Sequence, residues 1–188
     1  MDNRSKILEC ALEMFWARGY DAVGVQEIVE AAGVTKPTMY HYFGNKEGLL
    51  HELLNCQYSN LLDRIKQSAS YNGDLPLTMY KLTSSYFSYA KVNSKFYGLI
   101  MSFMFYPHES DPYKAVKPLI DNQISILEDL FFQASKDHGN MKNRHKTYAA
   151  TYFGMINTYI KLYFDSEIEL EEENTFKAIH QFMHGIYS

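Results

Sequence analysis

The stretch VTKPTMYHYFGNKEGLL, Val34 to Leu50, contains three consecutive residues that one helix face cannot bury together. These residues are Tyr40, His41 and Tyr42, and no acidic residue of the stretch precedes Glu47. An α-helix turns by about 100° per residue, so a helix with a single apolar face cannot bury three neighbours. At least one of the three side chains is therefore expected to face something other than the core of its own domain.

Glycines and capping residues around this stretch predict four helices in the first third of the chain. Gly19 and Gly33 are expected to end the first two helices, and Gly44 the third, because glycine accepts the backbone conformations found at helix ends. Thr35 is a suitable N-cap for the third helix, with Pro37 in its first turn. The apolar spacing predicts helices with faces at Ile7–Phe15 and Val25–Ala32, a third to Phe43, and a fourth from the Asn45 cap to about Gln67.

Two short helices joined by the glycine-containing segment AAGVTK predict a helix-turn-helix. In this motif the second helix lies in the major groove of DNA, with its N-terminal side chains at base edges. Hydroxyl groups can donate hydrogen bonds to phosphate oxygens, and lysines can neutralise phosphates. Met39 and Phe43 are expected to face inward. The predicted DNA contacts are Gln26, Thr35, Lys36, Pro37, Thr38, Tyr40, His41, Tyr42 and Lys46.

The charge of the chain does not by itself indicate a nucleic-acid-binding protein. The 188 residues carry a net charge of −4. Residues 1–50 hold five basic and seven acidic side chains, a net charge of −2. Only the span from Ala31 to Lys46, with two lysines and no acidic residue, is locally positive. Neutral donors such as tyrosine hydroxyls and backbone amides would therefore have to make many of the phosphate contacts.

The rest of the chain predicts an all-α fold without strands and with about nine helices in total. We expect a helix-turn-helix domain over residues 1–46 and a helical ligand-binding and dimerisation domain over residues 47–188. Pro118 is expected either in a first turn or at a kink. The later helices are expected over Leu77–Val92, Ser94–Tyr106, Pro112–Asp137, Asn143–Asp165 and Glu171–Tyr187.

Composition favours a soluble cytoplasmic protein. The start of the chain is polar and then amphipathic, unlike a secretory signal. The longest apolar stretch, Phe96 to Pro107, is shorter than the roughly 20 residues that span a bilayer. The two cysteines, Cys10 and Cys56, fit a reducing compartment better than a disulfide framework.

The segment GYDAVGVQEIVEAAGVTKPTMYHYFGNKEGLL resembles the DNA-binding signature of the TetR/AcrR family of transcriptional regulators. The resemblance covers Ile7 to about Leu54, with the AAGV turn, the TKPTMYHYF helix and the NKEGLL segment all in register. Family members commonly have hydroxyl residues before the second helix, where this chain has Val23 and Gly24. Many members have a small residue after the lysine, where this chain has Pro37, as some do.

The resemblance implies a homodimer whose two helix-turn-helix units bind the halves of a palindromic double-stranded DNA operator. It also implies that a small-molecule inducer binds in the C-terminal domain, and that the last two long helices pair with their counterparts. Apolar stripes on those helices agree with such an interface, although both stripes could also be intrachain core. The predicted interface residues are Tyr152, Ile156, Tyr159, Phe176, Ile179, Met183 and Ile186.

Aromatic and methionine residues suggest where such an inducer would bind. A mainly apolar ligand could lie among Tyr97, Met101 and Phe105, with Phe153 and Asn157 opposite, although such stripes are more often plain core. His180 and His184 have a spacing that can chelate a metal, but no further histidine lies close to them, and surface or interface histidines are the simpler interpretation. No cofactor is expected.

Two functions remain open on the sequence alone. The favoured one is a DNA-binding regulator, a repressor released from its operator by a small ligand. The alternative is a helical ligand- or protein-binding module whose helix-turn-helix no longer binds DNA. The sequence contains no glycine-rich phosphate loop and no convincing nucleophile and base, so an enzyme is not expected.

Overall fold

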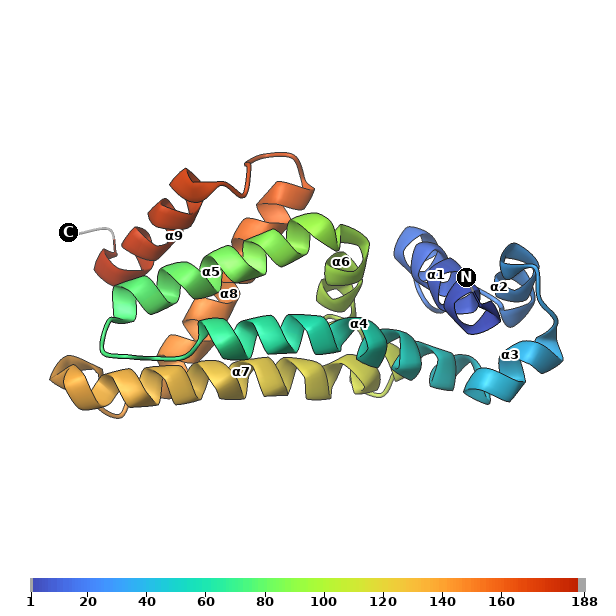
Figure 1. Ribbon diagram of the computed structural model, residues 1–188, viewed down its shortest axis with the longest axis horizontal. Coiled ribbons are helices and arrows are strands. Elements are labelled where there is room, and N and C mark those ends of the chain that lie inside the picture. Colours follow the sequence, from blue (N-terminus) through green and yellow to red (C-terminus); the bar gives the residue numbers. More distant parts are fainter. Residues whose placement is uncertain (1, 186–188) are drawn as a thin grey trace. The chain divides into compact units, whose positions relative to one another are not determined.

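A computed structural model describes residues 2–185 of the chain, and this part is built from helices joined by short connections (Figure 1). It contains nine α-helices, one short 3-10 helix and no strand. The predicted all-α class is thus confirmed. None of the described helices has both the length and the apolar character needed to cross a membrane. The helices are α1 (Asn3–Arg18), α2 (Val25–Ala32), α3 (Lys36–Phe43), α4 (Lys46–Ser68), α5 (Leu75–Val92), α6 (Ser94–Phe103), α7 (Asp111–Asp137), η1 (Gly139–Met141), α8 (His145–Phe164) and α9 (Glu172–His184).

Side chains just before several helices explain where those helices begin. Asp2 accepts a hydrogen bond from the Ser5 amide at the start of α1, and Asp74 accepts one from the Leu77 amide at the start of α5. The Asn45 side chain accepts a 2.6 Å hydrogen bond from the Gly48 amide in the first turn of α4. These bonds satisfy amides that have no partner within the helix.

The chain forms two compact units, and their division differs from the predicted division at residue 46. The first unit comprises Met1–Ser59 together with Lys95–Leu119, and the second comprises Asn60–Ser94 together with Ile120–Ser188. Helices α4 and α7 each begin in the first unit and end in the second. Helix α6 therefore groups with the first three helices, although 50 residues separate the end of α3 from the start of α6. The sequence had placed this segment in the second domain, residues 47–188.

In the second unit, α5 packs against both α8 and α9 around a core with paired polar groups. The Tyr152 hydroxyl is fully buried, bonding to the Thr83 hydroxyl at 2.7 Å and to the Met79 carbonyl oxygen at 2.8 Å. The Tyr86 hydroxyl donates to the Gln123 side chain at 3.0 Å. Burial of these hydroxyls is tolerable because each has a partner.

Helix α6 is shorter than predicted. The sequence predicted a helix to Tyr106, but the helix ends at Phe103, and the next residues form turns in which the Phe105 amide bonds to the Ser102 carbonyl oxygen. Pro107 explains the early end, because a proline disfavours helical backbone in the residue before it. Pro118, in contrast, lies inside the continuous α7.

Candidate DNA-binding helices and their connection to the chain

The turn between α2 and α3 has the tight geometry of a helix-turn-helix. Gly33 adopts the left-handed conformation, with φ 65° and ψ 34°, and its amide donates to the Glu30 carbonyl oxygen. The Val34 amide donates to the Val29 carbonyl oxygen at 2.9 Å, which completes the cap of α2. Helices α1, α2 and α3 pack on one another, so the turn fixes the direction in which α3 leaves α2.

Helix α3 buries its inward residues and exposes the aromatic triplet. Met39 is fully buried and Phe43 is 8% exposed. Tyr40 and Tyr42 are 45% and 44% exposed, and His41 is exposed as well. The His41 and Tyr42 rings lie edge to face, with centroids 5.5 Å apart. All three side chains of the triplet are thus exposed, whereas the sequence predicted that at least one of them would face away from the core.

The start of α3 presents hydroxyl groups. The Thr35 hydroxyl oxygen accepts a hydrogen bond from the Thr38 amide at 3.4 Å and lies 2.9 Å from the Thr38 hydroxyl. Because one hydroxyl of the pair donates to the other, the second keeps its own proton available for an outside acceptor. Lys36 and Pro37 are exposed in the same turn. These four residues form a small donor-bearing surface beside the aromatic triplet.

Helix α2 begins without a hydroxyl cap. Gly24 is the N-cap residue, and its amide donates to the Glu27 carboxylate at 3.0 Å. The Arg18 guanidinium bonds to the same carboxylate at 2.5 Å and to the Ala22 carbonyl oxygen at 2.9 Å. The hydrogen bond from Arg18 holds the pKa of Glu27 below its usual range, and the Gly24 amide lowers it further. Gln26 is exposed on α2 and bonds to Glu30.

Lys46, predicted to contact a DNA phosphate, also makes contacts within the chain. Its ammonium group donates a 2.6 Å hydrogen bond to the Tyr20 carbonyl oxygen and lies 4.0 Å from the centre of the Tyr20 ring. Removal from water lowers the pKa of Lys46, although Asp21 and Asp111 act in the opposite direction. The hydrogen bond to the loop before α2 uses one of the three N–H donors of this ammonium.

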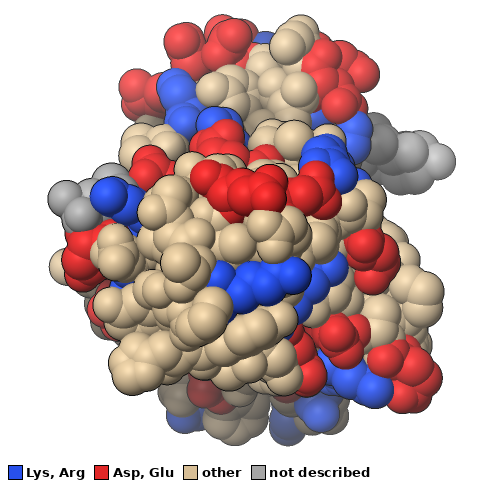
Figure 2. Space-filling model, turned by 90° about the vertical axis from the view of Figure 1, so that its right-hand side faces the viewer, with Lys and Arg blue, Asp and Glu red and all other residues tan. Residues whose placement is uncertain are grey.

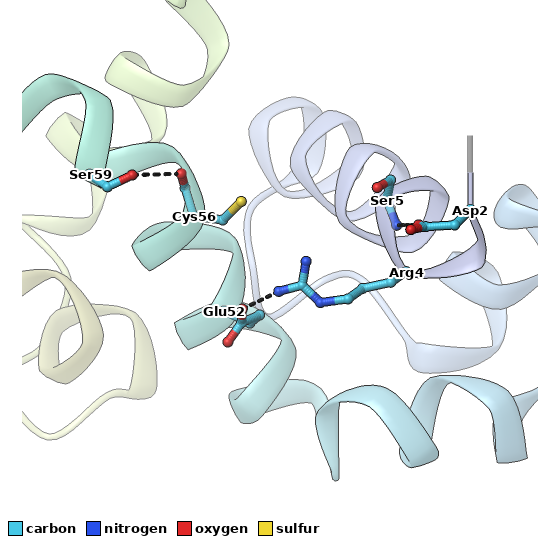
Figure 3. A network of polar contacts seen from close by, with 6 residues as sticks. All are labelled: Asp2, Arg4, Ser5, Glu52, Cys56 and Ser59. Atoms are coloured by element: carbon cyan, nitrogen blue, oxygen red, sulfur yellow. Dashed lines mark hydrogen bonds and ion pairs between the residues drawn. The ribbon is translucent and has the colours of Figure 1, made fainter.

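Several contacts that the sequence did not predict connect α1 with α4 and α6, and the loop after α1 with α7, inside the first unit. Figure 3 shows Arg4 of α1 paired with Glu52 of α4. The Lys95 ammonium at the start of α6 bonds to both carboxylate oxygens of Glu13, at 2.5 and 2.6 Å. The Tyr20 hydroxyl donates to the Asp111 carboxylate of α7 at 3.2 Å. Burial, together with Asp111, raises the pKa of that hydroxyl.

Gly98 of α6 lies against the indole ring of Trp16, the single tryptophan of the chain. A Cβ atom at position 98 would stand 2.5 Å from Cζ3 of the ring. A side chain larger than hydrogen would therefore collide with Trp16 unless the ring moved. The lone glycine inside an apolar helix is the only sequence feature that could have suggested this close approach.

The five predicted ligand-binding residues do not form one cavity within either unit. Tyr97, Met101 and Phe105 belong to the first unit, whereas Phe153 and Asn157 belong to the second. Phe105 is 86% exposed, because α6 ends two residues before it. The Asn157 side chain donates to the Phe153 carbonyl oxygen at 2.8 Å.

The predicted dimer residues divide into core and surface. Tyr152 and Ile156 are fully buried within the chain and Ile179 is 6% exposed, so these three residues are intrachain core, the alternative that the sequence left open. Tyr159 is partly exposed and stacks on Phe87. On α9, Phe176 and Met183 are exposed. Ile186 lies outside the described residues.

His180 and His184 lie next to each other on α9, with ring centroids 4.5 Å apart. No group of three or more histidine, cysteine, aspartate or glutamate residues that could hold a metal ion occurs within residues 2–185.

Comparison with known proteins finds transcriptional regulators. The transcriptional activator FasR of Mycolicibacterium smegmatis is 23% identical over 189 aligned positions, which cover 98% of this chain and 82% of FasR. The transcriptional repressor KstR2 of Rhodococcus jostii is 31% identical over 84 positions, covering 44% of this chain and 41% of KstR2. These relatives are named as regulators of transcription and not as enzymes.

The fold also matches a solved regulator. The FadR structure from Bacillus subtilis, determined in complex with stearoyl-CoA, has a TM-score of 0.79 at 19% identity, covering 97% of this chain and 99% of that one. The family profile described as "Bacterial regulatory proteins, tetR family" matches residues 7–53, which contain α1, α2, α3 and the start of α4. Residues 7–53 thus carry the DNA-binding segment of the tetR family of bacterial regulatory proteins.

Proposed function

We propose that this regulator is a homodimeric repressor that binds a palindromic DNA operator through α3 and leaves it when a small, mainly apolar ligand binds. The single observation that carries the DNA-binding part is the exposure of Tyr40, His41 and Tyr42 beside buried Met39 and Phe43. Large apolar rings exposed together on a rigid, short helix indicate a contact surface, and the helix-turn-helix geometry supports DNA as the partner.

Within that surface, position suggests the role of each side chain. Lys36 is exposed in the first turn of α3, where base edges come nearest in this motif, and a lysine there can bind guanine. The Thr35 and Thr38 pair has one hydroxyl proton available for a phosphate oxygen. Tyr40 and Tyr42 each offer an exposed phenol ring with a hydroxyl group, and Pro37, His41 and Gln26 complete the surface. Lys46 is left out, because its ammonium is bound to Tyr20.

The small number of cations predicts modest non-specific binding. Figure 2 shows a short row of basic side chains within a broad uncharged area, bordered by acidic side chains. Non-specific affinity depends on the number of phosphates that are neutralised. A surface with few lysines therefore relies on hydrogen bonds from neutral donors, and sequence-independent binding should be weak at physiological salt.

Exposed apolar residues on α9 support the homodimer. Phe176 and Met183 are 61% and 42% exposed and lie seven positions apart, on the same side of the helix. The outward positions of α8 carry small residues, which allow close approach of a second helix. These positions are Ala150, Thr151, Gly154 and Thr158. A dimer that covered Phe176 and Met183 would remove the largest apolar side chains exposed on α9 from water.

Ligand control is supported by the contacts between α1 and α6. The stearoyl-CoA in the FadR complex carries a long apolar acyl chain, and an apolar group of this kind suits the many aromatic and methionine side chains of this chain. A ligand changes DNA affinity only if it prefers one arrangement of the protein. A shift of α6 would act on α1 through Trp16 and Glu13. FasR is named an activator, and KstR2 is named a repressor. That this protein represses transcription is therefore part of the proposal.

The experiment is a fluorescence-anisotropy titration of DNA from upstream of the protein's own gene, with a shuffled duplex of equal length as the control. We expect the upstream duplex to bind at least 100-fold more tightly than the shuffled duplex at moderate salt. The ratio of specific to non-specific affinity in DNA-binding regulators is typically about 10³–10⁷. Equal affinities for the two duplexes would contradict the proposal.

The alternative, a helical module that no longer binds DNA, is favoured by one local feature. Glu27 brings a carboxylate to the start of α2, and Gly24 offers no hydroxyl there. Arg18 offsets that charge. No measurable binding to any duplex, by a folded dimer, would favour the alternative.

A further inference from the structure

A cavity of about 220 Å³ lies inside the second unit, at the end where α5 begins and α7 ends. Aromatic and methionine side chains make up most of its wall. Phe131 of α7, Tyr148 of α8 and Phe182 of α9 meet there, with ring centroids 5.9 to 6.4 Å apart. Met79, Met141 and Met183 also line it. Methionine side chains adapt to irregular shapes, so such a wall can close around small apolar groups.

His138 is one of the lining residues, and its side chain has a buried nitrogen without a hydrogen-bond partner among the described residues. The Nε2 atom of His138 is buried and makes no hydrogen bond among the described residues. The backbone amide of His138 is bonded to the Ala134 carbonyl oxygen, which fixes the residue at the end of α7. A buried polar atom without a partner costs about 1–3 kcal/mol, so native proteins rarely contain one without a reason. A ligand atom that bonds to Nε2 would remove this cost.

The chain around the cavity is basic, although the whole protein is acidic. Residues 136–146 include Lys136, Lys142, Arg144 and Lys146, against one acidic residue, Asp137. The net charge of this segment is +3, counting histidines as neutral, whereas that of the chain is −4. The Arg144 guanidinium lies 5.1 Å from the centre of the Tyr148 ring, which lines the cavity. Positive charge near the opening favours an anionic ligand group.

We propose that this cavity binds a small carboxylic acid with an apolar body, whose carboxylate accepts a hydrogen bond from Nε2 of His138. The volume sets the size of the ligand. A cavity of about 220 Å³ has room for an unbranched acid of hexanoate size. The carboxylate would lie toward the basic segment and the hydrocarbon among Met79, Phe131 and Phe182.

Occupation of the cavity has a direct consequence for α9. Phe182 and Met183 belong to the cavity wall, while Phe176 and Met183 belong to the face proposed to pair with a second copy. A ligand in the cavity therefore contacts the helix on which the proposed dimer depends. An effect of the ligand on the dimer through α9 rests on the proposed function. Binding of the acid in the cavity does not.

The experiment is an NMR titration of the intact protein carrying ¹³C-methyl methionine, with hexanoate as the probe and hexanamide as its uncharged analogue of equal size. We expect hexanoate to shift the methyl signals of Met79, Met141 and Met183 and to leave that of Met39, a buried residue of α3, unchanged. Hexanoate should bind about tenfold more tightly than hexanamide, the effect of a hydrogen bond to a charged group.

Variants in one segment assign the interaction to His138. His138→Ala should remove the preference for hexanoate, and His138→Gln, which keeps a donor, should retain part of it. His145→Ala is the matched control, because His145 lies against Phe132 and does not line the cavity. Thermal melting of each variant shows whether it is folded.

Three results would overturn the proposal: no methyl shifts with hexanoate, equal binding of the two probes, or an unchanged preference in a folded His138→Ala variant. The DNA titration is independent of all three. A protein that binds its upstream duplex but not hexanoate would support the proposed function and contradict this inference. A protein that binds hexanoate but not the duplex would support this inference and contradict the proposed function.

Discussion

Gly98 of α6 and Trp16 of α1 are in such close contact that a Cβ atom at position 98 would stand 2.5 Å from the indole ring. The two residues join α1, a helix of the DNA-binding motif, to α6, which lies about 80 positions later in the chain. Because Trp16 is the single tryptophan, its fluorescence reports on the surroundings of this ring.

Gly98→Ala should move the Trp16 ring outward and shift its emission to longer wavelength. Alanine improves helix propensity by about 1 kcal/mol, but overpacking costs about 1–3 kcal/mol. We expect a net loss of about 1 kcal/mol in unfolding free energy, measured by urea denaturation. In a Trp16→Ala background the same change should stabilise the protein, since the ring is gone. Destabilisation of equal size in both backgrounds would show that the contact is unimportant.

Lys46→Met should lower stability without changing the salt dependence of DNA binding. The variant removes the 2.6 Å hydrogen bond to the Tyr20 carbonyl oxygen and the ammonium over its ring. We expect a loss of about 1–2 kcal/mol in unfolding free energy, measured by urea denaturation. The slope of log affinity against log salt should stay constant, because each phosphate contact contributes about 0.9 to it. A slope reduced by about one would restore the phosphate role that the sequence predicted.

The sequence predicted the local structure of the first three helices almost to the residue. Gly19, Gly33 and Gly44 end α1, α2 and α3 because short-range backbone and capping preferences decide these positions. The inward direction of Met39 and Phe43 follows from helical periodicity. Such features depend on neighbours a few positions away, which a single sequence displays directly.

Lys36→Ala should change which DNA sequence is preferred. Lys36 is exposed in the first turn of α3 and is expected at a base edge. Loss of a good contact to guanine costs about 1–3 kcal/mol at that position of the operator. Binding to a library of duplexes with single base changes measures this directly. An equal loss for specific and shuffled DNA would instead make Lys36 a phosphate contact.

Phe176→Glu should convert the dimer into monomers. Phe176 is 61% exposed on α9, and a charge there would be buried without a partner in the proposed interface. Sedimentation velocity at micromolar concentration measures the change. Phe105→Glu is the matched control, since Phe105 is more exposed but lies in the other unit. A wild-type monomer, or a Phe176→Glu dimer, would contradict this assignment of the interface.

The candidate sites that depend on distant contacts could not be predicted from the sequence. Lys46 had the charge and position of a phosphate contact, but the Tyr20 carbonyl oxygen, 26 residues away in sequence, takes up its ammonium. Tyr152 and Ile156 form an apolar stripe whether they contact α5 or a second copy, and periodicity does not distinguish these partners. Nothing in the sequence marked His138, because an unpaired nitrogen is visible only in three dimensions.

The central claim is that the exposed face of α3 contacts DNA, and a double variant, Tyr40→Ala with Tyr42→Ala, tests it most directly. Both rings are nearly half exposed, so their loss should leave melting temperature and dimer mass almost unchanged. Phe132→Ala, at a site with 47% exposure in the second unit, is the matched control. Anisotropy titration with the upstream duplex should then show affinity at least tenfold weaker for the double variant, about 1.4 kcal/mol, and unchanged for the control. Equal affinity of the folded double variant and the wild type would contradict the account.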